Sequence, residues 1–174
     1  MSDSTVFLLA RVLHIVASTV WSGAAILIAC FVMPAVQAAG PAGAAVMRQL
    51  TVVRKVPLVL ALVAVLAVLS GFYLYWTTSG GLRSAWLHTA TGSSYTAGAA
   101  AAMVAIVIGA GINIPAANRM GAIAATIQMA GEQPTAAQSE ILKGLALRVI
   151  RGTRAVAVLL AVATAAMAAA RYLP

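Results

Sequence analysis

The sequence predicts an all-α fold: an integral membrane four-helix bundle with an amphipathic cytoplasmic extension of the fourth helix. Three observations predict it. Of 174 residues, 63% are hydrophobic and only 8% are charged, about a third of the roughly 25% found in soluble domains. The mean hydropathy is +1.00. Four separate segments are apolar over about 20 residues, the length that crosses a bilayer. This low charge content excludes a soluble enzyme and a nucleic-acid-binding domain. No nucleic-acid partner is therefore expected.

We predict one membrane domain, 1–174, with spans at about 12–34, 57–76, 95–115 and 155–171. The first apolar run lacks a basic n-region and exceeds the roughly 7–15 residues of a signal-peptide core, so we interpret it as a true span. Pro57 suits the first turn of the second span. Pro115 closes the third and predicts a kink.

The connections 37–56 and 116–154 are expected to contain helices of their own. Glycine and proline at 40–43 predict a turn before a short helix that carries Arg48. A second break is expected at 131–134. Thr135 and Gln138 then have the spacing of a capping box, so a new helix begins there and runs unbroken into the fourth span.

The basic residues predict the orientation of the chain. Eight of them lie in the two connections and three elsewhere: Arg48, Arg54, Lys55, Arg119, Lys143, Arg148, Arg151 and Arg154, against Arg11, Arg83 and Arg171. Because Lys and Arg collect in cytoplasmic loops, both connections are predicted to be cytoplasmic and both termini to lie outside, in a bacterial inner membrane.

The start of the last helix is amphipathic, and its basic residues lie near one face: Lys143, Arg148, Arg151 and Arg154. We expect them to contact the anionic headgroups of the lipid bilayer, at about 1 kcal/mol for each residue. Alternatively, this face docks another protein. The spans are rich in Gly and Ala, which allow close helix packing and predict either a homo-oligomer or a place in a larger membrane complex.

His14 is the first candidate ligand, because an ionisable group inside a membrane segment is costly and marks a functional position. Arg11 lies three residues earlier, on the same helix face. With Arg11 at the outer interface, His14 lies about 5 Å deeper. The two interpretations of His14 are a ligand to haem b or copper, and a neutral histidine hydrogen-bonded to a neighbouring helix.

His88, the only other histidine, falls in the second outer connection, on the same predicted side as His14. Two imidazoles could hold a haem iron or a copper ion between them. Otherwise His88 is an ordinary exposed loop residue. A weaker candidate pair is Cys30 and Met33, whose soft sulfur atoms would suit Cu(I), although methionine is also a common core residue.

The first span resembles the first helix of the CopD-like copper-resistance membrane proteins and of the HemJ-type haem-synthesis proteins. The resemblance is carried by Arg11-x-x-His14, Trp21-Ser22-Gly23 and the closing Met33-Pro34. Ser70-Gly71 in the second span is also similar. The resemblance implies a four-helix membrane module for copper or haem, with His14 as the cofactor contact. The second ligand would then be His88, a methionine or another subunit.

The sequence is therefore compatible with three alternative functions. The first is a small membrane protein that holds b-type haem or copper near the outer face, for cofactor handling or electron transfer. The second is a non-catalytic subunit of a larger membrane complex. The third is a small transporter or channel, for which Asn113, Pro115 and Asn118 would break the third span along an ion path. The sequence holds no hydrolase or transferase constellation, and redox activity stays open.

Overall fold

The computed structural model of the chain describes residues 3–131 and 133–173, and all regular structure in these residues is helical. The predicted all-α fold is confirmed. Four helical stretches are long and apolar enough to cross a membrane: Asp3–Ala38, Val56–Thr78, Ala90–Ala130 and Ala136–Ala170. The first three stretches contain the predicted spans 12–34, 57–76 and 95–115 and extend beyond their ends. The fourth begins 19 residues before the predicted span 155–171 and ends one residue short of its end.

The first stretch consists of α1 (Asp3–Leu27), the π-helical turn η1 (Ile28–Val32) and α2 (Met33–Ala38). The predicted short helix with Arg48 is present as α3 (Gly40–Arg48), and the π-helical turn η2 (Gln49–Val53) follows it. Gly43 allows α3 to approach α2, because a Cβ atom there would overlap the carbonyl oxygen of Val36.

The second stretch, α4 (Val56–Thr78), has Pro57 in its first turn as predicted. A tight loop follows, with Gly80, Gly81 and Leu82 all at positive φ. This loop leads to the four-residue helix α5 (Ser84–Leu87). The third stretch then begins with α6 (Ala90–Ile108), whose N-terminus is capped by the Thr89 hydroxyl accepting the Gly92 N–H at 2.9 Å.

The third stretch continues through the π-helical turn η3 (Gly109–Asn113) into α7 (Ile114–Ala130). Proline lacks an N–H and its ring clashes with the carbonyl four residues back, so it disturbs an α-helix. Here Pro115 follows the wider turn η3, in which the Ile114 N–H donates to the Gly109 carbonyl. The helix is therefore continuous at Asn113 and Asn118. The unwound segment expected for a transporter is absent from this described stretch.

The fourth stretch is one helix, α8 (Ala136–Ala170), which begins at the predicted capping box. The Gln138 N–H donates to the Thr135 hydroxyl oxygen at 3.2 Å, and the Thr135 N–H donates to Oε1 of Gln138 at 2.9 Å. Gly131 ends α7 in the left-handed conformation, at φ 67°. The predicted break and the unbroken run into the fourth span are thus confirmed.

We expect Thr135→Ala to destabilise the start of α8 by about 1 kcal/mol, because one orphan backbone donor loses its acceptor. Hydrogen exchange should become faster in the amides of the first turn of α8 and stay unchanged in its second half. Thr126→Ala is the matched control, since the Thr126 hydroxyl only donates back to Ala122 within α7. Equal exchange in both variants would show that the cap contributes nothing.

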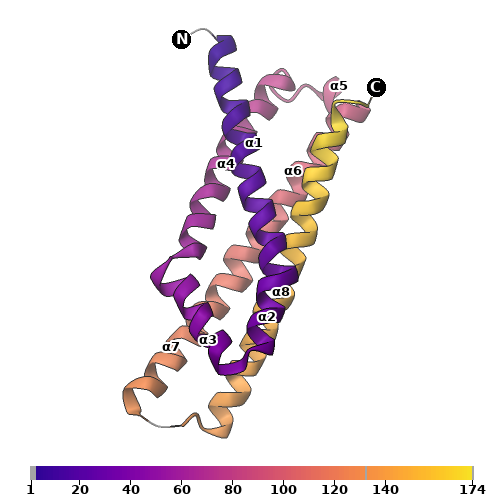
Figure 1. Cartoon of the computed structure of the whole chain (residues 1–174). Helices are drawn as coiled ribbons and strands as arrows, with labels where there is room; N and C mark the ends of the chain where they lie inside the picture. Colours follow the sequence, from indigo (N-terminus) through magenta and orange to yellow (C-terminus); the bar gives the residue numbers. More distant parts are fainter. Residues whose placement is uncertain (1–2, 132, 174) are drawn as a thin grey trace.

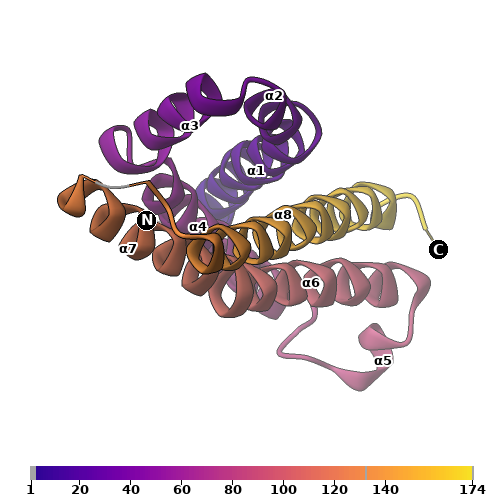
Figure 2. The same cartoon turned by 90° about the horizontal axis from the view of Figure 1, so that it is seen from below.

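The helices lie side by side in pairs: α1 runs beside α4, α6 runs beside α8, and α1 also contacts α8 (Figures 1 and 2). The start of α1 and the end of α8 lie at one end of the molecule, together with α5, and we call this the terminal end. The two basic connections, with α3, α7 and the start of α8, lie at the opposite, basic end (Figure 1).

Small side chains form most of the core. The buried apolar residues are mainly alanine, with Leu145, Ile150, Val156 and Leu160. At Gly98 a Cβ atom would lie 3.1 Å from the Ala163 carbonyl oxygen, so α6 and α8 approach closely there. The accessible surface is 10862 Å², whereas a compact soluble protein of this mass exposes about 7,900 Å². Most large apolar side chains therefore face outward.

Candidate functional site

The His14 imidazole lies between α1 and α4 and is held by backbone of the neighbouring helix. Its Nδ1 is 2.8 Å from the carbonyl oxygen of Ala67, which is buried in α4. A carbonyl only accepts, so Nδ1 carries the proton and donates. In the neutral ring the other nitrogen, Nε2, then has a free lone pair. The hydrogen bond to Ala67 therefore leaves Nε2 free to accept a hydrogen bond or to bind a metal ion.

Two further residues of α4 shape the place of the ring. Gly71 makes room for it, because a Cβ atom at this position would lie 2.7 Å from Cε1 and 2.9 Å from Nδ1 of His14. The Ser70 hydroxyl donates to the Leu66 carbonyl at 2.5 Å and to the Ala67 carbonyl at 3.2 Å. The Ala67 oxygen thus accepts from both a hydroxyl and the imidazole, which holds His14 half-buried against α4.

The ring lies deep along α4. Ala67 and Gly71 are eleven and seven residues before the end of α4 at Thr78, which is about 16 and 10 Å at 1.5 Å per residue. His14 thus contacts the middle of α4. It lies farther from the end of the helix than the single turn, about 5 Å, that was expected from its spacing to Arg11. Arg11 lies one turn nearer the terminal end, where it is exposed and has no hydrogen bond or ion pair to the described residues.

His88 lies elsewhere, just after α5. It is exposed, and its Nδ1 donates to the Ser84 carbonyl at 2.7 Å within the same loop. The neighbouring Trp86 packs between Tyr75 of α4 and Tyr95 of α6, with ring centroids 5.5 and 6.3 Å away. The two histidines thus bond different carbonyls, one in the middle of α4 and one in the loop. The structure shows no contact that joins them.

The sulfur candidates are also separate from His14. Cys30 is exposed within η1, and Met33 is half-buried at the start of α2. Both follow His14 by four turns or more of the same helical stretch, toward the basic end. Within residues 3–131 and 133–173, no three His, Cys, Asp or Glu side chains gather closely enough to hold a metal ion.

The residues that position His14 could not all be found from the sequence. The acceptor at Ala67 is a backbone atom, which every residue type carries, so the sequence does not indicate it. Gly71 can be noticed in the sequence, because it is the only glycine in the second predicted span, 57–76. A lone glycine in a bulky span indicates a close approach. Comparison of the chain with family models, curated proteins and solved structures gave no match.

Proposed function

We propose that this chain is a small integral membrane protein that holds b-type haem or a copper ion through Nε2 of His14, for cofactor handling or electron transfer. The observation that carries the proposal is the hydrogen bond from Nδ1 to the Ala67 carbonyl. Metal-bound histidines commonly donate their second N–H to a carbonyl or carboxylate, which fixes the tautomer and makes the ligating nitrogen more basic. The resemblance to CopD-like and HemJ-type proteins supports the same residue.

His14 is suited to be the first ligand of haem or copper. His14 supplies one neutral nitrogen that suits both haem iron and copper, and either metal would supply one-electron redox chemistry when bound. Ala67 and Gly71 hold the ring from the α4 side. The second ligand is proposed to come from His88 after movement of its loop, from a methionine, or from another copy of the chain.

We further propose that the molecule is oriented with its basic end in the cytoplasm and its terminal end outside, in a bacterial inner membrane. The four apolar stretches and the outward-facing apolar side chains support membrane insertion. The gathering of both basic connections at one end supports the orientation, since cytoplasmic loops carry an excess of Lys and Arg. The proposed cofactor would then lie in the outer half of the bilayer.

The proposal is tested by the visible absorption spectrum and the metal content of the full chain, purified in mild detergent. A haem protein shows a Soret band that shifts on reduction, and a copper protein contains close to one copper per chain or per pair of chains. Absence of both, even after reconstitution with hemin or with copper, contradicts the proposal.

A second function, a non-catalytic subunit of a larger complex, is favoured by a groove between α1 and α8. The groove has a volume of about 440 Å³ and small or apolar lining residues: Thr19, Ser22, Gly23, Ile26, Ala161, Thr164, Ala165 and Ala168. Small residues allow a further helix to approach closely in lipid, whether from a larger partner or from a second copy.

We expect Gly23→Ile to abolish such an association without disturbing the fold, since nothing lies within 4 Å of a Cβ atom at Gly23. Native mass spectrometry in mild detergent would then detect the complex for the unmodified chain and a monomer for the variant. A monomer or a homo-oligomer alone, for the unmodified chain, would argue against the subunit function.

A further inference from the structure

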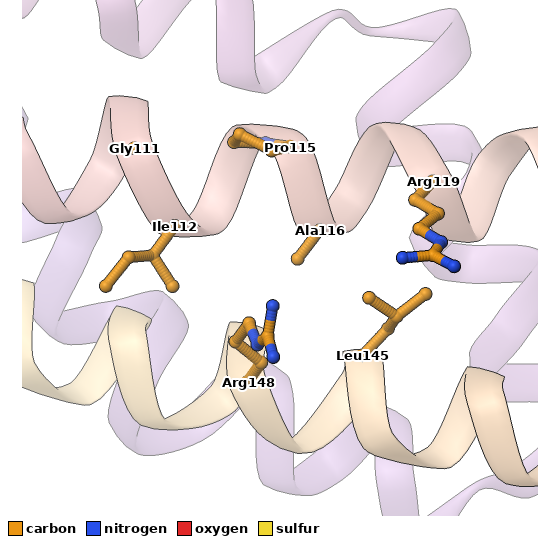
Figure 3. Close-up of a pocket in the computed structure, with 7 residues that line it drawn as sticks. All are labelled: Gly111, Ile112, Pro115, Ala116, Arg119, Leu145 and Arg148. Atoms are coloured by element: carbon orange, nitrogen blue, oxygen red, sulfur yellow. The ribbon is translucent and has the colours of Figure 1, made fainter.

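At the basic end, η3, α7 and α8 line an open cavity that the His14 site does not use. Its volume is about 300 Å³, at the lower end of the roughly 300–1,000 Å³ typical of ligand sites. Seven residues line it: Gly111, Ile112, Pro115, Ala116, Arg119, Leu145 and Arg148. Figure 3 shows that Arg119 extends from α7 and Arg148 from α8 into the space between the two helices.

Among the described residues, no carboxylate forms an ion pair with either arginine. Among residues 3–131 and 133–173, the only ion pair joins Lys143 to Glu140, at 2.9 Å. Arg119 and Arg148 make no hydrogen bond there either. Both side chains are exposed and line the same cavity, so an anion that contacts both would be stabilised by both. Arginine is also the side chain whose planar donors match phosphate oxygens in pairs.

A close contact between η3 and α8 lies next to the cavity. Asn113, at the end of η3, packs against α8 so closely that a Cβ atom at Gly152 would overlap its Oδ1. This Oδ1 is buried and lacks a hydrogen-bond partner in the described residues. The contact holds η3, which supplies Gly111 and Ile112 to the cavity, against α8 one turn from Arg148. π-helical turns such as η3 are frequent at functional sites.

The rest of the lining is apolar and leads onto outward-facing apolar surface. Ile112, Pro115 and Leu145 form walls of the cavity, and Ile112 and Ile114 are 41% and 48% exposed. A free phosphate ion would gain nothing from this surface, whereas the acyl chains of a lipid would cover it. The cavity therefore places two arginines, unpaired among the described residues, beside an outward-facing apolar wall.

We propose that this cavity binds the phosphate headgroup of one anionic phospholipid, held between Arg119 and Arg148, with its acyl chains along the apolar wall. This inference depends on the membrane insertion proposed above, but not on a cofactor at His14. Of the four basic residues of α8 that were expected to contact lipid headgroups, only Arg148 is assigned to this lipid. Lys143 is paired with Glu140. The four arginines of α7 and α8 are all exposed, but Arg151 and Arg154 lie outside the cavity.

The test is a titration of the full chain in zwitterionic detergent with phosphatidylglycerol, followed by native mass spectrometry. We expect one tightly retained phosphatidylglycerol per chain and none of the neutral phosphatidylcholine. The double variant Arg119→Gln/Arg148→Gln should bind at least about tenfold more weakly, because two charge-assisted contacts are lost. The control Arg151→Gln/Arg154→Gln loses the same charge outside the cavity and should stay within about threefold of the unmodified chain.

Three further results decide the proposal. Arg119→Lys/Arg148→Lys keeps the charge but not the paired geometry, so an intermediate loss of binding supports it. Equal weakening in the cavity variant and the control would show a diffuse basic face and overturn it. Displacement of the lipid by millimolar inorganic phosphate would identify a free phosphate site and overturn the lipid assignment. The His14 spectrum is measured on the same samples, so failure of one proposal is distinguishable from failure of the other.

Discussion

His14→Ala is expected to abolish the bound cofactor, with complete loss of the Soret band or of the stoichiometric copper. The structure gives the reason, because Nε2 of His14 is the one imidazole nitrogen that is both held within the helices and left with a free lone pair. The substitution also removes the imidazole donor from the Ala67 carbonyl, so a small loss of stability accompanies it. Absorption and metal analysis of the purified variant check the result.

His88→Ala is the comparison for this variant. If His88 is the second ligand, the absorption bands shift and the cofactor is held more weakly, but some binding persists. If it is an ordinary loop residue, the spectrum is unchanged. Full cofactor content in His14→Ala, in a protein with unaltered helical circular dichroism, would contradict the role of His14.

Gly71→Ala is expected to displace the imidazole and to lower cofactor occupancy by about tenfold or more, although no ligand is removed. The new Cβ atom would lie 2.7 Å from Cε1 of His14, closer than such atoms approach, so the ring must leave the Ala67 carbonyl. A ligand misplaced by about 1 Å loses much of its function. Occupancy is measured by titration of the apoprotein with hemin or copper.

Gly121→Ala is the matched control for this substitution, since it places the same methyl group in α7 with nothing within 4 Å. It should titrate like the unmodified chain and gain slightly in helix stability. If both variants bind equally well, close packing of Gly71 on His14 has no part in the site.

Features with a local chemical cause could be predicted from the sequence. The capping box at Thr135, the start of α4 at Pro57 and the short helix with Arg48 depend on residues within one or two turns, and all three are present. The four apolar stretches could also be predicted, because their length and composition are sufficient to identify them. The ends of the long helices could not be predicted, since a helix continues past its apolar part wherever its backbone hydrogen bonds remain satisfied.

The arrangement around the sites depends on contacts that sequence spacing does not encode. The depth of His14 follows from the pairing of α1 with α4, which brings Ala67 and Gly71 to its ring. Arg119 and Arg148 are 29 positions apart, and only the return of the chain from α7 into α8 brings them into one cavity. The π-helical turn η3 before Pro115 also depends on the packing of this stretch against α8, and the residue types at 109–113 do not reveal it.

Pulsed electron paramagnetic resonance of the His88→Ala protein, grown with ¹⁵N-histidine, tests the central claim most directly. The chain contains two histidines, so the label in this variant reports His14 alone. With ferric haem or Cu(II) bound, we predict the strong hyperfine coupling of a directly coordinated ¹⁵N nucleus. A bound paramagnetic centre without that coupling would contradict ligation by Nε2 of His14.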